Sequence, residues 1–131
     1  MPKVETLTPA NTPTPIGPYN HIAKVGSWIT IGGVAGINPK SGQLAGADVF
    51  SQAAQILESF QIMLESVGSD LAHILHINVF LKNMDDFEEM NHAYTAKMLN
   101  HIPARTVIGV KELPKPGFLL TMNLTAVTKE T

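Results

Sequence analysis

The sequence predicts one α+β domain in which helices and β-hairpins are interspersed along the chain. Its 131 residues suit one domain and are too few for two, so residues 1–131 are taken as a single domain. Apolar residues make up 44% and charged residues 15%, so the chain should fold rather than stay disordered. Stretches with helical spacing of apolar residues alternate with β-type stretches, in the order ββ-α-β-α-ββ.

The N-terminal third predicts an extended arm, a hairpin and a loop. Five prolines in the first 18 residues exclude a helix there, and a short strand is possible near Val4. Residues 21–31 are rich in β-branched and aromatic side chains and are interrupted by Gly26-Ser27, which predicts two strands joined by a tight turn. Glycines end the second strand, and residues 32–47 are predicted to form a loop where a ligand can approach the backbone.

A long helix and a strand follow. Asp48 is the expected cap of a helix that ends before Gly68, with apolar residues at i, i+3, i+4 and i+7 between them. In residues 75–82, aliphatic side chains occupy every second position, which predicts a strand with one buried face. The side chains expected on that face are those of Leu75, Ile77, Val79 and Leu81.

A second helix is predicted from Asp85 to near Asn100, with Glu88 in capping-box relation to Asp85. Two more strands are predicted at residues 105–110 and 118–127. Because two helices can cover only one face of such a sheet, the other face should carry exposed apolar side chains and bind another subunit. The candidates for this exposed face are Trp28, Ile31, Phe80, Leu120 and Met122.

Charge and composition exclude several functions. The net charge of -2 gives no basic surface for a nucleic acid, so nucleic acid is not expected as a partner. The absence of cysteine excludes disulfides, thiol nucleophiles and cysteine-based zinc sites. The five histidines lack an HExxH spacing, so they are interpreted as surface or helix-end residues and no metal is expected. No signal peptide or membrane span is recognisable, which indicates a soluble, cytoplasmic protein with no membrane partner.

Arg105 is the most informative position. It stands at the start of an apolar strand, where a guanidinium is costly unless it reaches solvent or pairs with an anion. Composition alone favours a structural ion pair at the strand end. The alternative is a bidentate fork for the carboxylate of a ligand.

The segment Pro103-Ala104-Arg105-Thr106, together with residues 15–19 (Pro-Ile-Gly-Pro-Tyr) and the strand at 120–127, resembles the reactive-intermediate deaminase family (RidA/YjgF, also called endoribonuclease L-PSP). The similarity runs nearly end to end, including the turn at 38–42, the strand at 79–82 and the helix at 86–94. It implies a chorismate-mutase-like fold, with a mixed six-stranded sheet and two helices on one face. It also implies a homotrimer with ligand sites between subunits.

The resemblance further implies a reaction without a cofactor. Arg105 would grip the carboxylate of a 2-imino or 2-enamino acid, which water converts into a 2-keto acid and ammonia. Tyr19 would close the pocket and Asn91 would lie near it. The backbone at Gly33 and Val107 would contact the ligand.

Three positions depart from the family pattern. Gly32 replaces a serine, Val107 replaces a cysteine, and Thr121 replaces the glutamate that positions or activates water. A threonine hydroxyl is not an anion at neutral pH and cannot replace the glutamate as a base. The chain can therefore bind the ligand without catalysing its turnover. The first hypothesis is a hydrolytic imine deaminase of the 2-iminobutanoate/2-iminopropanoate type, with Arg105 and Thr121 as candidate catalytic residues. The alternative is a non-catalytic binding or regulatory module for small 2-keto acids or other carboxylates, and an endoribonuclease is the least favoured.

Overall fold

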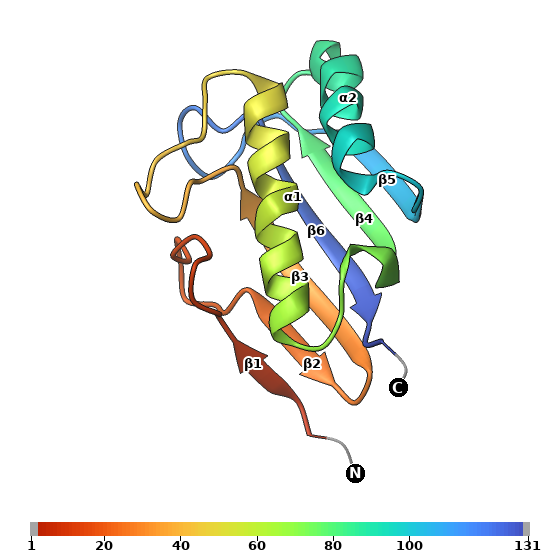
Figure 1. Cartoon of the computed structure of the whole chain (residues 1–131). Coiled ribbons are helices and arrows are strands. Elements are labelled where there is room, and N and C mark those ends of the chain that lie inside the picture. Colours follow the sequence, from red (N-terminus) through yellow and green to blue (C-terminus); the bar gives the residue numbers. More distant parts are fainter. Residues whose placement is uncertain (1–2, 130–131) are drawn as a thin grey trace.

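The computed structural model describes residues 3–129, which form a mixed six-stranded sheet with both helices on one face (Figure 1). The sheet order is β1-β2-β3-β6-β4-β5, and all neighbouring strands are antiparallel except the parallel pair β4 and β5. This confirms the predicted sheet and its two-layer arrangement. The elements are β1 (Glu5–Leu7), β2 (Ile22–Val25), β3 (Trp28–Ala35), α1 (Val49–Ser66), the 3₁₀ turn η1 (Leu71–His73), β4 (Ile74–Leu81), the 3₁₀ turn η2 (Met84–Asp86), α2 (Phe87–Met98), β5 (Ala104–Gly109) and β6 (Leu120–Val127).

Helix α1 begins and ends as predicted. The Asp48 carboxylate accepts a 2.8 Å hydrogen bond from the backbone N–H of Ser51, which satisfies one of the free donors of the first turn. Gly68 lies just beyond the helix with φ of 79°, a conformation that favours glycine. The apolar stripe between these residues, including the fully buried Ile56 and Phe60, packs on the sheet.

Helix α2 begins differently from the prediction. Asn83, rather than Asp85, caps this region, because its side-chain oxygen accepts a 2.9 Å bond from the N–H of Asp85 and starts the 3₁₀ turn η2. The N-cap of α2 is Asp86, which makes no side-chain capping bond. The expected capping box between Asp85 and Glu88 is therefore wrong. The helix ends at Met98, two residues earlier than expected, since the next residue has φ of 55°.

The two faces of the sheet differ from the predicted ones. Ile31, Leu120 and Met122 were expected on the open face, but they are at most 1% exposed and belong to the core beneath the helices. Trp28 is on the open face as predicted and is 51% exposed, and Phe80 is half-buried. The remaining open face is more polar than expected. Its centre holds Asn78 and Asn123, whose side chains share a 2.8 Å hydrogen bond, with Thr30 and Thr125 beside them.

Two strands contain irregularities that the sequence did not indicate. Strand β3 continues through the glycines to Ala35, and its pairing with β6 shifts register between Ile31 and Val34. In β4 the register shifts between Ile74 and His76, so Ile74 is buried while Leu75 is 41% exposed. The predictions of a strand end at residue 32 and of a buried Leu75 are therefore wrong.

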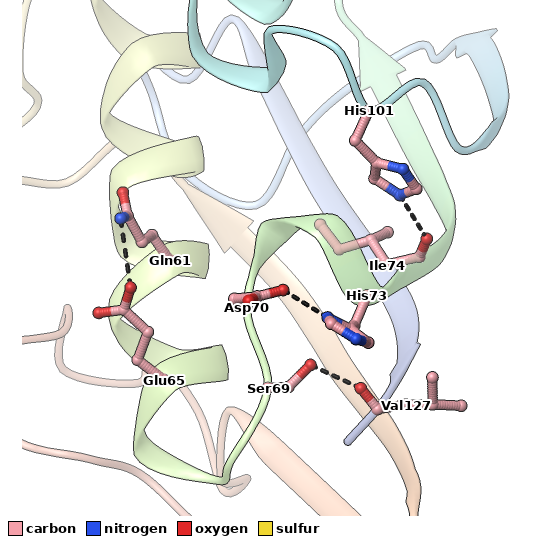
Figure 2. A network of polar contacts seen from close by, with 8 residues as sticks. All are labelled: Gln61, Glu65, Ser69, Asp70, His73, Ile74, His101 and Val127. Carbon is pink, nitrogen blue, oxygen red and sulfur yellow. Dashed lines mark hydrogen bonds and ion pairs between the residues drawn. The ribbon is translucent and has the colours of Figure 1, made fainter. Parts of the chain in front are cut away.

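A group of hydrogen bonds fixes the start of β4 (Figure 2). The Ser69 hydroxyl donates to the carbonyl of Val127 over 2.6 Å, and Nδ1 of His73 lies 2.6 Å from the carboxylate of Asp70. Nε2 of His101, which follows α2, lies 2.9 Å from the Ile74 carbonyl. These bonds join the beginning of β4 to the end of β6 and to the connection between α2 and β5.

Candidate functional site

A cavity of about 510 Å³ opens between the N-terminal arm, the sheet and the loop before β6. Its volume lies within the range of about 300–1,000 Å³ that is usual for small-molecule sites. None of its described lining residues is Asp, Glu, Lys or Arg, so no carboxylate, ammonium or guanidinium group of these residues faces it. The lining residues are Pro13, Thr14, Ile16, Tyr19, Asn20, His21, Gly32, Gly33, Ala35, Ile37, Pro114, Phe118 and Thr121.

The arm over the cavity is held by hydrogen bonds to His21, the residue just before β2, and by one ring contact. Nε2 of the buried His21 lies 2.5 Å from the carbonyl of Pro13, and the His21 N–H donates to the Thr8 hydroxyl. Because Nε2 faces a carbonyl acceptor, it carries a proton and donates. The Tyr19 ring meets the His21 ring edge-on at a centroid distance of 5.9 Å, and its hydroxyl accepts a bond from the N–H of Ile16. Tyr19 is therefore positioned at the mouth of the cavity, and 42% of its surface is exposed.

Gln52 holds the two loops that form the far wall. Its side-chain amide is fully buried in α1 and donates 3.0 Å bonds to the carbonyls of Gly46 and Gly117. Its oxygen accepts a 2.9 Å bond from the N–H of Leu119. The backbone of Gln52 also approaches Gly36 so closely that a Cβ there would lie 2.6 Å from it. One buried side chain thus fixes both the loop after β3 and the loop before β6.

Arg105 lies away from this cavity, on the helix side of the edge strand β5. Its guanidinium lies 4.7 Å from the centre of the Tyr94 ring and 5.8 Å from that of Phe87, and Nη1 is 3.8 Å from the sulfur of Met90. Within residues 3–129, no carboxylate lies within ion-pair distance of it. Aromatic faces, rather than a structural ion pair, therefore hold the cation.

Unpaired polar atoms lie on the same helix as the rings that hold Arg105. The Asn91 side-chain oxygen and the Tyr94 hydroxyl are buried, and neither has a hydrogen-bond partner among the described residues. They are three positions apart on α2 and so lie on one side of the helix. Burial raises the pKa of Tyr94 above its usual 10.0, against the opposing effect of Arg105, so the phenol stays protonated at neutral pH. Val107, two residues from Arg105, packs against the core on the same face of β5.

The six predicted site residues therefore form two groups. Tyr19, Gly33 and Thr121 line the cavity together. Arg105, Asn91 and Val107 belong to β5 and α2, on the helix side of the sheet. Within one chain, the structure does not bring the two groups together.

The histidines are less peripheral than the sequence suggested. His21 is only 3% exposed and lines the cavity, so its interpretation as a surface or helix-end residue is wrong. Its Nδ1 atom is buried without a hydrogen-bond partner in the described part of the chain. No group of three or more His, Asp or Glu residues that could hold a metal ion occurs within residues 3–129. In the same range, no helix is long and apolar enough to cross a membrane.

Sequence reasoning missed several residues of both groups. Ile37 and Pro114 line the cavity from loops, where no periodicity marks a buried side. Phe118 lines it from the loop before β6, because that strand begins at Leu120 and not at residue 118 as predicted. Phe87 and Tyr94 belong to α2, where nothing in the local sequence indicates that they face a cation. Their contact with a lone arginine becomes visible only when β5 is placed beneath α2.

Comparison with known proteins agrees with this architecture. The family model described as endoribonuclease L-PSP matches residues 9–128. A RutC family protein of Pyrococcus horikoshii is 37% identical over 111 residues, covering 85% of this chain and 88% of that protein. A 2-iminobutanoate/2-iminopropanoate deaminase of Escherichia coli K12 is 35% identical over 114 residues, covering 85% of this chain and 88% of that protein.

Solved structures show the same fold. The YjgF gene product of E. coli superposes with a TM-score of 0.89 at 33% identity, over 95% of this chain and 99% of that chain. E. coli TdcF with bound serine gives a TM-score of 0.89 at 27% identity, over 95% of this chain and 99% of that chain. With a family model that matches most of its length and relatives above 30% identity, this chain belongs to the RidA/YjgF family, whose family model is called endoribonuclease L-PSP.

Proposed function

We propose that the protein hydrolyses reactive 2-imino and 2-enamino acids to 2-keto acids and ammonia. The observation that carries this proposal is Arg105, a half-buried guanidinium held by aromatic rings without a carboxylate partner in the described chain. Such a cation can form two parallel charge-assisted hydrogen bonds with a ligand carboxylate. Relatives named 2-iminobutanoate/2-iminopropanoate deaminase at 30–35% identity support this choice of substrate class. The serine bound to E. coli TdcF is likewise a small amino carboxylate.

The reaction needs water and no oxidant or cofactor. A 2-enamino acid first becomes the imine by gaining a proton at C3 and losing one from nitrogen. The water oxygen then bonds to C2 of the imine, and one of its protons passes to the imine nitrogen. The C2–N bond of the resulting carbinolamine then breaks, the remaining hydroxyl proton leaves C2–OH for the amine, and ammonia departs from the new 2-keto acid. In this proposal Thr121, whose hydroxyl can donate and accept hydrogen bonds, orients the water in the cavity.

In this proposal the working site is formed by two copies of the chain. Arg105 and the cavity residues lie on different faces of one sheet, so a ligand that contacts both must lie between copies. We propose a homotrimer of the chorismate-mutase-like type, with Arg105, Asn91 and Val107 of one copy beside the cavity of the next. Exposed Trp28 and Ile108 on the open face would be buried by this assembly.

A second candidate is a binding module for small 2-keto acids that does not catalyse turnover. Thr121 favours it, because the cavity contains no carboxylate among its described residues that could act as a general base. Both candidates share Arg105 as the anchor for the ligand carboxylate. They differ in whether ammonia is released.

The deciding experiment generates 2-aminoacrylate in place with a serine dehydratase and follows ammonia release. A deaminase accelerates release above the spontaneous rate, in an Arg105-dependent manner. A binding module leaves the rate unchanged but still binds pyruvate in calorimetry. A wild-type protein that neither accelerates ammonia release nor binds pyruvate would contradict both candidates.

A further inference from the structure

The floor of the cavity is formed by residues without side chains. Gly32 and Gly33 lie at the irregular part of β3, where its pairing with β6 shifts register. Within one chain, a Cβ atom added to either glycine would meet no other atom within 4 Å, so both leave space on the cavity floor of that chain. Neither has a positive φ, which means that the backbone there does not itself require glycine.

The walls around this floor are mainly apolar, and none of the described lining residues is Asp, Glu, Lys or Arg. Ile16 closes one side from the arm, and Ile37, Pro114 and Phe118 close the other from the two loops that Gln52 holds. The Thr121 side chain is short and carries no charge. Within one chain this cavity has a volume of about 510 Å³, and burial of apolar ligand surface against its apolar walls is favourable. None of its described lining residues is an Asp, Glu, Lys or Arg that could pair with a second charge on the ligand.

We infer that this cavity selects 2-imino acids with bulky apolar side chains, of the size of those of leucine or phenylalanine, over 2-iminopropanoate with its methyl group. The inference rests on the proposed function and names the substrate class of the same site. Arg105 of a neighbouring copy holds the carboxylate, and the apolar side chain enters the space above Gly32 and Gly33. Hydrophobic pockets discriminate by about 10–200-fold for each methylene group, so the preference should be large enough to measure.

The experiment uses imino acids made in place from D-alanine, D-leucine and D-phenylalanine by D-amino acid oxidase with catalase. Release of the 2-keto acid is measured against spontaneous hydrolysis. The wild-type kcat/KM for the leucine or phenylalanine product should exceed that for the alanine product by at least about tenfold. Gly32→Val narrows the cavity, so the ratio of large to small substrate should fall by about tenfold or more.

Two further variants make the steric argument specific. Gly33→Val adds the same side chain at the second floor position and should lower the ratio in the same direction. Ala96→Val adds two methyl groups on the exposed side of α2 and should leave the ratio at the wild-type value. Light scattering and circular dichroism show whether each variant folds and assembles like the wild type.

A wild-type preference for the alanine product would overturn the inference, as would folded glycine variants with an unchanged ratio. Failure of the proposed function looks different, because then none of the three imino acids is hydrolysed above the blank. In that case the size preference is tested by calorimetry with pyruvate, 4-methyl-2-oxopentanoate and phenylpyruvate. Weaker binding of the two larger 2-keto acids than of pyruvate would again contradict the inference.

Discussion

Arg105 and Thr121 lie on opposite faces of the same sheet. Arg105 pairs with Ile77 of β4, which is buried beneath the helices, whereas Thr121 pairs with Phe80, which points to the open face. Consecutive strand residues alternate between faces, so residues 77 and 80 belong to different faces. Arg105 and the cavity that Thr121 lines are therefore separate within one chain.

Arg105→Ala should weaken binding of pyruvate or 2-ketobutyrate by at least about tenfold, because each charge-assisted hydrogen bond is worth about 1.5–3 kcal/mol. Isothermal calorimetry measures this change. Arg105→Lys should also bind weakly, since an ammonium group cannot form the planar bidentate fork. Unchanged affinity in a folded Arg105→Ala protein would show that the guanidinium serves only the packing of Phe87 and Tyr94.

Thr121→Glu should raise kcat on 2-aminoacrylate, because it places a carboxylate that can act as a general base in the cavity. The expected gain is at most about 100-fold, the lower end of general acid–base contributions. The residues around the cavity do not hold the new carboxylate in a fixed orientation toward the water. Steady-state kinetics must separate kcat from KM, since the new anion also repels the substrate carboxylate. If the wild-type enzyme already has a high kcat and Thr121→Glu lowers it, water is activated by another group.

Gln52→Leu should lower the free energy of unfolding by at least about 2 kcal/mol, because it leaves buried backbone groups of Gly46, Gly117 and Leu119 without partners. Urea denaturation at neutral pH measures the loss. The matched control is Gln55→Leu, nearly one turn further along α1, where only a hydrogen bond to Ser59 is lost and about 1 kcal/mol or less is expected. Equal losses in the two variants would contradict the special role of Gln52.

Asp70→Asn should reduce the acid sensitivity of the fold. The hydrogen bond from His73 is the main cause that holds the pKa of the Asp70 carboxyl below its usual 3.8. The stabilisation from a lowered carboxyl pKa is present above that usual value and is lost as the pH falls through the folded-state pKa. The free energy of unfolding, measured with urea, should therefore fall less between pH 7 and pH 3 for Asp70→Asn than for the wild type. Asp85→Asn, at an exposed carboxylate, serves as the control. The argument is contradicted if the free energy of unfolding of Asp70→Asn falls between pH 7 and pH 3 by as much as that of the wild type.

Elements defined by local interactions could be predicted from the sequence. Helix α1 follows from the Asp48 cap, the apolar spacing and Gly68, all within one segment. The hairpin of β2 and β3 follows from Gly26-Ser27 in the same way. Arg105 stood out because a charge at the start of an apolar strand is unusual, and the family resemblance gave it a role.

Features decided by distant partners could not be predicted. Strand β3 passes through Gly32 and Gly33 because β6 pairs with it on both sides of the irregularity. Leu75 is exposed because the register shift in β4 moves Ile74 into the core instead. The burial of His21 depends on Pro13, which the arm brings back over β2. In each case the deciding contact joins segments that are distant in the sequence, and no local pattern predicts that they meet.

The most direct test of the account asks whether one ligand site is built from two copies of the chain. Arg105→Ala lacks the carboxylate anchor, and Gly33→Phe fills the cavity, so each protein alone should bind pyruvate poorly. In trimers assembled at random from equal amounts of both, about a quarter of the sites combine an intact Arg105 with an intact cavity from the neighbour. Calorimetry on the mixed trimers should therefore recover about a quarter of the wild-type sites, at wild-type affinity. Mixed trimers that bind no more pyruvate than the two parents, or a wild-type protein that binds it as a monomer of 14.1 kDa, would contradict the account.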